Sequence, residues 1–417
     1  MVDIDSFFIF STLNHELKSD YTSIKKKLFS LRQAVNDLFF QGHISKAQIA
    51  RQKKVSRNFV IAWTRSPKQD YMRDDRGWPR GKRRKWDQTT VRRIRAIHER
   101  LAQDPGEFYV GATVIVQQWR KLYPGSSSPP LRTIGRILAE LGLSAPRKKG
   151  RNKGAARYLC YPEHTIYERF GGRVLEADFV GRKYLKERTE PLNFIGYSFK
   201  KAPRLRYFKR IEGQTADNFI AQTKAFFDYF ETPDYIKVDN TGATIGSASG
   251  KRNISRAMRF LLERQVVPIF TVPRKPFSQA SIEGNNSVFA RKFWTRREFK
   301  GLADVDEQLA CFNQASQRYL EYQPPLRKKR RSRNFVPKVY FIRQVREHNR
   351  TGFIEVLHTT INLPKSYINY FVLAEWNLLE ERLYIHFEKD LQSRMIKELT
   401  FRINRRSHDK HQHLLAK

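Results

Sequence analysis

Hydrophobic residues recur at helical spacing in the first part of the chain. Residues 44–66 have the pattern of two short helices around a tight turn, with Ser56 as the N-cap of the second. That second helix would carry Arg57, Asn58 and Arg65, residue types that suit base edges and phosphates. The pattern is typical of a helix-turn-helix, although any small helical hairpin with solvated basic residues would share it.

A second helical region follows a Gly-, Pro- and Arg-rich connection. Apolar residues at helical spacing predict three more helices, within 88–105, 111–124 and 126–143. The last of these has a Ser/Pro start signal and carries Arg132 and Arg136 near its beginning. It fits a second recognition helix, and a supporting helical bundle is the alternative.

The pattern changes to alternating strands and helices between 165 and 325. Strands are predicted at 173–181, 191–199, 204–212, 234–240 and 266–273, with helices at 215–231, 255–265 and 280–294. This order predicts an α/β domain, in which a mixed sheet of about five strands is flanked by helices. Short strands at 352–358, 370–377 and 382–389 then predict a small β-barrel.

The net charge of the chain indicates what kind of partner it binds. The 417 residues include 80 Lys and Arg against 41 Asp and Glu, a formal net charge of +39. Such a balance favours a polyanion, nucleic acid more than an anionic membrane surface. A hydrophobic content of 40% and an aromatic content of 13% are too high for a disordered basic tail. No apolar run approaches the ~20 residues of a membrane span, and the acidic N-terminus does not resemble a signal peptide, so we expect a soluble intracellular protein.

Two basic segments separate the predicted domains. We expect both to be solvated tethers that lie along a phosphate backbone. Their candidate contact residues are Lys148 and Lys149 in the first, and Lys328, Lys329 and Arg330 in the second. The cysteines, Cys160 and Cys311, are far apart and predict neither a disulfide nor a zinc site.

Three carboxylates are the candidate chemistry of the α/β region. Asp178 lies on the first predicted strand, Asp239 ends the fourth, and Glu283 lies near the start of a helix. Ligand sites often form at the carboxyl ends of such strands. If the two strands are neighbours, converging acids would repel one another unless Mg²⁺ or Mn²⁺ neutralised them, and a pair of such ions clamps a phosphodiester. Glu176 points to the same face as Asp178 and is the alternative ligand.

The segments "KVDNTGATIGS" and "PRKPFSQASIEGNNSVFARKFW" resemble the integrase core of the DDE transposases, which include insertion-sequence transposases and retroviral-type integrases. The family pattern falls on Asp178, on Asp239 with Asn240, and on Glu283 with Asn286. The resemblance covers residues 165–300 and implies an RNase H-like core. It also implies an enzyme that cleaves transposon ends and joins the 3′-hydroxyl to target DNA, with two Mg²⁺ or Mn²⁺ ions held by the three acids.

The chain departs from the family pattern in three places. Thr241 stands where many relatives have Gly, and the segment before Glu283 is longer than usual, with the extra length at 241–255. A basic residue that contacts DNA often follows the Glu by seven positions. Residue 290 is Ala here, so Arg291 and Lys292 are the candidates instead.

The predicted layout has six parts. These are a helix-turn-helix domain at 1–75, a second helical or helix-turn-helix domain at 82–145, a basic linker at 146–164, the catalytic core at 165–325, a basic linker at 326–338 and the barrel at 339–400. The resemblance implies double-stranded DNA as partner, both transposon ends and target. It also implies a homo-oligomer on that DNA, no membrane partner, and a cytoplasmic location at the bacterial nucleoid.

Two other functions fit the same residues. One is a catalytically silent, sequence-specific DNA-binding regulator derived from a transposase. The other is a structure-selective nuclease with the same core. Retention of all three acids favours catalysis, and the predicted helix-turn-helix segments argue against the nuclease.

Overall fold

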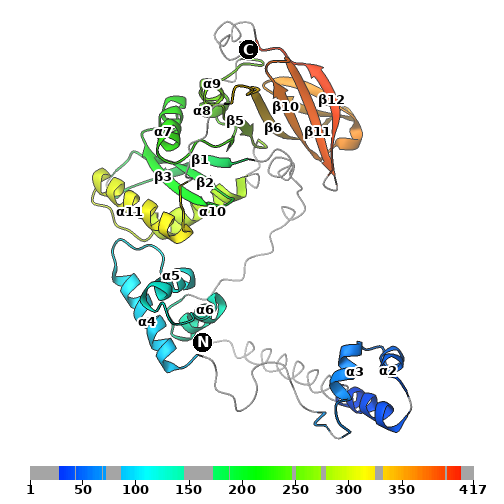
Figure 1. Cartoon of the computed structure of the whole chain (residues 1–417). Helices are drawn as coiled ribbons and strands as arrows, with labels where there is room; N and C mark the ends of the chain where they lie inside the picture. The colour runs from blue at the N-terminus through cyan, green and yellow to red at the C-terminus, as the bar shows by residue number, and fades with distance from the viewer. Residues whose placement is uncertain are drawn as a thin grey trace, which may run out of the picture. The chain divides into compact units, whose positions relative to one another are not determined.

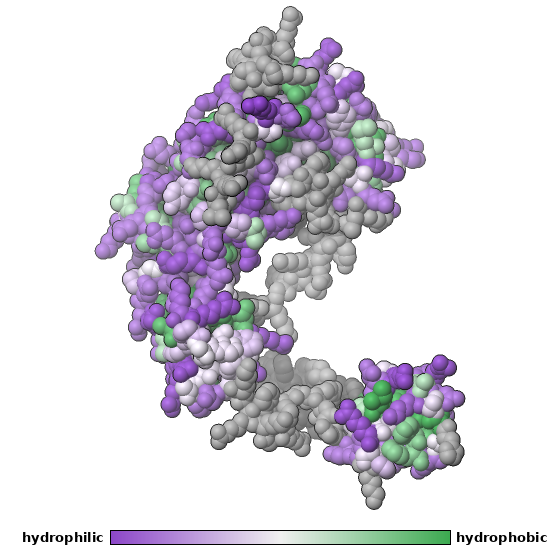
Figure 2. Space-filling view, in the orientation of Figure 1, coloured by the Kyte–Doolittle hydropathy of each residue, from purple (hydrophilic) through white to green (hydrophobic). Residues whose placement is uncertain are grey.

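The computed structural model divides into two compact units, Met1–Asp87 and Gln88–Lys417. It describes residues 28–42, 44–67, 69–71, 86–144, 172–186, 188–246, 250–273, 279–324, 332–389 and 392–404. The linker at 146–164 with Lys148 and Lys149 lies outside the described residues, as do Lys328, Lys329 and Arg330. Figure 2 shows hydrophilic residues over most of the face in view, in keeping with the high charge.

The first unit contains a helix at 28–41, α2 (Lys46–Gln52) and α3 (Arg57–Trp63). Its small core is formed by Val35, Ile49, Val60 and Trp63. The predicted pair of short helices is confirmed, and the Ser56 side chain accepts a hydrogen bond from the backbone N–H of Phe59, as an N-cap does.

The second unit begins with α4 (Gln88–Gln103), α5 (Ala112–Leu122) and α6 (Leu131–Glu140), which confirm the three predicted helices. Their apolar faces share a core with later parts of the chain, because Phe108 packs against Phe293 and Phe312. The structure therefore differs from the expected division between 82–145 and 165–325, since the two segments pack as one body.

A mixed sheet with helices on both faces forms the body of this unit (Figure 1). Its first part contains the following elements in chain order: β1 (Val174–Lys183), β2 (Leu192–Phe199), β3 (Leu205–Ile211), α7 (Ala216–Tyr229), β4 (Tyr235–Val238), α8 (Gly242–Ile245), α9 (Arg256–Glu263), β5 (Val267–Phe270), α10 (Ala280–Phe289), the π-helical turn η4 (Ala290–Trp294) and α11 (Leu302–Leu320). The five predicted strands are all present, whereas α11 was not predicted.

The C-terminal part contributes β6 (Lys338–Gln344), β7 (Arg346–His348), β8 (Thr351–Val356), β9 (Thr359–Leu363), the 3₁₀ turn η5 (Lys365–Tyr367), β10 (Phe371–Asn377), β11 (Arg382–Lys389) and β12 (Gln392–Thr400). Here the structure corrects the prediction of a five-stranded sheet followed by a separate small barrel. The sheet has nine strands within the described residues, in the order β12-β11-β10-β6-β5-β4-β1-β2-β3. The reason is a parallel pairing of β5 with β6, at Ile269 with Tyr340 and Phe270 with Phe341. Strands β7, β8 and β9 form a second sheet.

Alternating side chains place the two faces of the sheet in different cores. On β2, Ile195 and Tyr197 belong to the core that includes α7 and α9. Phe194 belongs to the core that includes α10 and α11. This alternation is the two-residue period of a strand buried on both faces. Among the described helices, none is long and apolar enough to span a bilayer.

Candidate active site

Two of the three predicted acids lie side by side because of the sheet register. Strand β1 runs parallel to β4, with Glu176 opposite Lys237. Asp178 and Asp239 each lie two residues beyond that pair: Asp178 is within β1, and Asp239 directly follows the last residue of β4. The two strands are thus neighbours, which is the condition on which the predicted site depended.

Helix α10 carries the third acid across the same face of the sheet. The backbone N–H of Ile282 donates to Glu176 Oε2 at 2.8 Å, and the Ser281 hydroxyl lies 3.0 Å from that of Ser198 on β2. Farther along the helix, Asn286 Nδ2 donates to Asp178 Oδ2 at 2.9 Å. Three separate bonds therefore fix α10 against β1 and β2, which sets where Glu283 lies.

The pKa values of the three acids respond to this arrangement. Burial first, then the neighbouring charge of Asp239 and a smaller effect of Glu283, raise the pKa of Asp178 to about 7, against a lowering by the hydrogen bond from Asn286. Burial also raises the pKa of Asp239, opposed by bonds from Thr241. Burial and Glu176 raise the pKa of Glu283, while Lys237 lowers it. Asp178 is thus influenced by both other acids.

The three carboxylates are suitable ligands for a hard cation such as Mg²⁺, but they do not lie close enough together to surround one. Carboxylate oxygens are the ligands that Mg²⁺ and Mn²⁺ prefer. Carboxylates that raise one another's pKa are also those that a cation would stabilise most. Across the described ranges, however, no three His, Cys, Asp or Glu side chains converge closely enough to hold a metal ion. Closing around a cation would require the acids to approach one another.

Glu176, the alternative ligand, accepts a hydrogen bond from the backbone at the start of α10. Its side chain is 2% exposed, and its Oε2 accepts the N–H at the first turn of α10, where the N-cap residue Gln279 provides no side-chain cap. A carboxylate in this position satisfies an N–H that the helix cannot bond itself. Sequence spacing placed Glu176 on the right face but gave no sign of this capping role.

Asn240, expected to contact DNA, is bonded within the protein. Its Nδ2 donates to the carbonyl of Thr271 at 2.6 Å, and its Oδ1 accepts from Arg343 at 3.0 Å. Arg343 on β6 also donates to the carbonyls of Thr271 and Glu355. Burial lowers the pKa of Arg343 to about 10. Arg343 thus holds the segment beside Asp239, and no sequence motif identified it, because its partners are distant in the chain.

The contact between Asn286 and Asp178 is helped by a glycine on β2, which leaves room for the Asn286 side chain. Gly196 is the residue opposite Asp178 in the register. A Cβ at that position would lie 3.3 Å from Asn286 Oδ1 and 2.8 Å from Phe208 Cε1. Asn286, predicted to contact DNA, therefore orients the first acid as well.

The basic residues after α10 differ in exposure. Arg291 is exposed, and its Nε donates to the carbonyl of Ser287 at 3.2 Å. Lys292 is half-buried in η4, and burial lowers its pKa, with smaller effects of Arg296 and Arg291. Arg291 is accordingly the more available of the two predicted DNA contacts.

The predicted recognition residues lie on exposed surfaces. Arg57, Asn58 and Arg65 are all exposed in the first unit, and Ile61, 39% exposed, lies on the same helix. On α6, Arg132 and Arg136 are exposed too, but Arg136 lies 3.6 Å from Glu140 in an ion pair.

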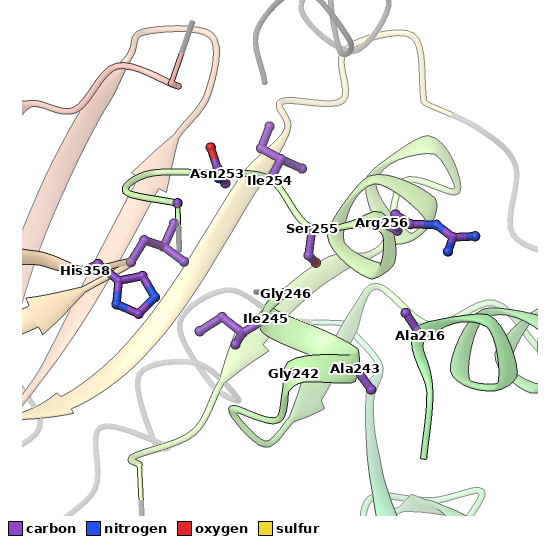
Figure 3. Close-up of a pocket in the computed structure, with 12 residues that line it drawn as sticks. Ala216, Gly242, Ala243, Ile245, Gly246, Asn253, Ile254, Ser255, Arg256 and His358 are labelled. Carbon is purple, nitrogen blue, oxygen red and sulfur yellow. The ribbon is translucent and has the colours of Figure 1, made fainter. Parts of the chain in front are cut away.

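A cavity of about 360 Å³ in the second unit has a lining of different chemistry (Figure 3). It lies where α8 and the N-termini of α7 and α9 meet, beside His358. Its ionisable lining residues are Arg256, which pairs with Asp217, and His358. No carboxylate lines it among the described residues, so the cavity is not the predicted cation site.

Comparison with known proteins gives limited guidance. No family model matches the chain, and no curated protein matches it either. Among solved structures, it is similar to a chain of the simian T-cell lymphotropic virus intasome in complex with PP2A regulatory subunit B56 gamma, with 11% identity and a TM-score of 0.31, over 62% of this chain and 93% of that one. It is also similar to a chain of a pre-cleavage Mos1 transpososome, with 10% identity and a TM-score of 0.22, over 70% of this chain and 96% of that one. Scores this low do not establish a shared fold or activity.

Proposed function

We propose that the chain is a DDE-type DNA transposase that cleaves transposon ends and joins the 3′-hydroxyl to target DNA. The observation that carries the proposal is the arrangement of the acids: β1 with Asp178 pairs with β4, which Asp239 follows, and Asn286, on the helix that carries Glu283, donates to Asp178. Acids from two neighbouring strands and one helix are thereby linked in one partly buried place. They are also the acids of the sequence segments "EADF", "KVDN" and "IEGN", which carry Asp178, Asp239 and Glu283 in turn.

The fold supports the proposal in a coarser way. We assign β1 to β5 with α7, α9 and α10 to an RNase H-like core, because this part of the sheet and its helices carry all three acids. The strands from β6 onward would then be the small C-terminal β domain, joined to the core along one strand. The helices α2 and α3 would form a helix-turn-helix that reads DNA with the exposed face of α3.

Each residue of the site has a task in this proposal. Asp178, Asp239 and Glu283 would hold two Mg²⁺ or Mn²⁺ ions, which when bound activate water and stabilise the charge on the phosphate. Asn286 keeps Asp178 Oδ2 oriented, and Glu176 fixes the start of α10. Burial and the charge of Asp239 raise the pKa of Asp178 to about 7, so a cation held there would compete with a proton. The net charge of +39 would hold the DNA.

Glu283→Gln tests the proposal most directly. The variant keeps size and hydrogen bonding but removes the charge that holds a cation, so cleavage and joining should fall by several orders of magnitude while DNA binding persists. The measurement is Mg²⁺-dependent joining of labelled end DNA beside binding by the same protein. Glu298→Gln, at an exposed acid outside the site, should remain active. Near-normal joining by Glu283→Gln would overturn the site assignment.

One observation favours a second function, the catalytically silent DNA-binding regulator. Within the described ranges, no three acidic, His or Cys side chains converge as a metal site. A regulator would bind element ends with the same salt dependence, yet the unchanged protein would show no Mg²⁺-dependent cleavage. The wild-type lane of the experiment above separates the two functions.

A further inference from the structure

A chain of buried polar contacts links the loop between α4 and α5 to the helix that carries Glu283. Arg206 on β3 donates from NH1 to the hydroxyl of Tyr109 at 2.7 Å and from Nε to Oδ1 of Asn285 at 2.8 Å. Asn285 in turn donates to the hydroxyl of Ser198 at 2.6 Å. Asn285 lies on α10 between Glu283 and Asn286 in the active-site region.

The centre of this chain is a charged group in an unusual setting. Arg206 is 8% exposed, and within the described residues no carboxylate lies within ion-pair distance of it. A buried charge is tolerated only where hydrogen bonds replace its lost hydration. Tyr109 and Asn285 supply such bonds, so the loss of either leaves a buried cation short of a partner.

Tyr109 is held firmly enough to act as an anchor. Its ring stacks on Tyr319 of α11, with centroids 4.4 Å apart, and its hydroxyl also lies 2.8 Å from that of Ser316. Burial, the largest cause, raises the pKa of the Tyr109 hydroxyl, so the hydroxyl stays neutral at ordinary pH. Next to this loop, Arg297 NH2 donates to the carbonyl of Pro105 at 2.6 Å.

From these contacts we propose that Tyr109, Arg206 and Asn285 are positioning residues for catalysis. They set the place of α10, and therefore of Glu283 and Asn286, relative to the two strand acids. The inference rests on the proposed function for its catalytic consequence. Its structural part, a restraint on α10 that comes from the α4–α5 loop, stands independently of any activity.

The hydroxyl of Tyr109 can be removed without its ring. In Tyr109→Phe the stacking on Tyr319 is kept while Arg206 loses one acceptor. We expect the rate of end cleavage at saturating DNA to fall about tenfold, as for a lost hydrogen bond to a charged group, with DNA affinity unchanged. Amide hydrogen exchange of residues 281–289, measured without DNA or Mg²⁺, should become faster.

Tyr319→Phe is the matched control, because it removes a hydroxyl from the other ring of the same stacked pair. This variant should show wild-type exchange in α10 and wild-type cleavage. Asn285→Ala should behave as Tyr109→Phe does, and the double variant should be little worse than either single one, as expected for residues in one network.

The outcomes separate the inference from the proposed function. Unchanged exchange in α10 of Tyr109→Phe would overturn the inference, whatever the activity. Equal loosening in Tyr319→Phe would also overturn it, since the effect would then be general. Faster exchange only in Tyr109→Phe, in a protein whose wild type does not cleave DNA, would keep the restraint on α10 and reject the proposed function.

Discussion

The three acids of the candidate site and the exposed polar residues of α3 are both predicted to act on DNA, yet the acids are partly buried and the α3 residues are exposed to solvent. Burial is the largest cause of the raised pKa of Asp178, Asp239 and Glu283, and Asp178 is raised further by the other two. Arg57 and Asn58 are exposed on a short helix whose core is separate and small. The first group interacts strongly with its neighbours, whereas the second interacts with solvent.

This difference determines how large the effect of a single substitution is, and whether it depends on neighbouring residues. Electrostatic interactions are strong in a partly buried site and weak among solvated charges. We therefore expect each acid to act as part of a unit, and each basic residue of α3 to contribute a modest, independent share of DNA binding. The following predictions run from the largest expected effect to the smallest.

Asp178→Asn should lower Mg²⁺-dependent cleavage by several orders of magnitude, because it removes one charge from a site that works as a whole. The double variant with Asp239→Asn should be hardly slower than either single variant. The measurement is single-turnover cleavage of labelled end DNA. Losses that multiply in the double variant would show that the acids act independently, contrary to the proposed site.

Salt should have the next largest effect, and on binding only. With a net charge of +39, many phosphate contacts release many counterions, so affinity should fall about a thousandfold between roughly 50 and 200 mM salt. Titration of labelled duplex DNA at several salt concentrations measures the slope. An affinity that stays flat would contradict the assignment of a polyanion as partner.

The stability of the second unit should depend on pH without divalent cations. The folded state raises the pKa of Asp178 from 3.8 to about 7, so it keeps a proton that the unfolded chain has released. By linkage, stability falls as pH rises from about 4 to about 7, by up to about tenfold in the unfolding equilibrium per pH unit. Asp239 and Glu283 shift in the same direction.

Urea unfolding in EDTA at several pH values measures this dependence. Asp178→Asn should flatten the slope between about pH 5 and pH 7, since the amide does not titrate. Glu298→Gln, at an exposed acid, should leave the slope unchanged. A slope that is undiminished in Asp178→Asn would place the titrating group elsewhere.

The smallest effect is expected on α3. Arg57→Ala should lower the preference for element ends over random DNA about tenfold, as expected for one base-edge contact. Arg95→Ala, at an exposed arginine of α4, should weaken binding to both DNAs alike. Competition binding measures both ratios. If both variants changed the ratio of end binding to random-DNA binding equally, α3 would not be a recognition helix.

Local signals in the sequence predicted the elements that hold the site. Ser56 caps α3 as expected, and Thr215 caps α7 in the same way, because a cap depends only on residues a few positions away. Element order allowed the strands of Asp178 and Asp239 to be neighbours, and the parallel pairing of β1 with β4 makes them so. Helix α11 was missed, although Val305, Leu309 and Phe312 lie at helical spacing on its buried face.

Contacts between distant segments could not be predicted in the same way. The bond from Ile282 to Glu176 and the bond from Arg343 to Asn240 each join residues whose separation in the chain carries no pattern. A buried polar side chain needs a hydrogen-bond partner, and which residue becomes that partner depends on the fold. The pairing of β5 with β6 is also a contact between distant segments that no local pattern indicates. It joins the C-terminal strands to the sheet, where a separate barrel was expected.

That pairing has a consequence for how the chain is made. A ribosome synthesises β5 well before β6, and until β6 emerges the outer edge of β5 has unpaired N–H and C=O groups. Arg343, which holds the segment beside Asp239, arrives with β6 as well. A nascent chain that ends before these residues therefore exposes a sheet edge open to wrong pairing and lacks one support of its acids. Assembly of the candidate site therefore requires β6 to have been synthesised.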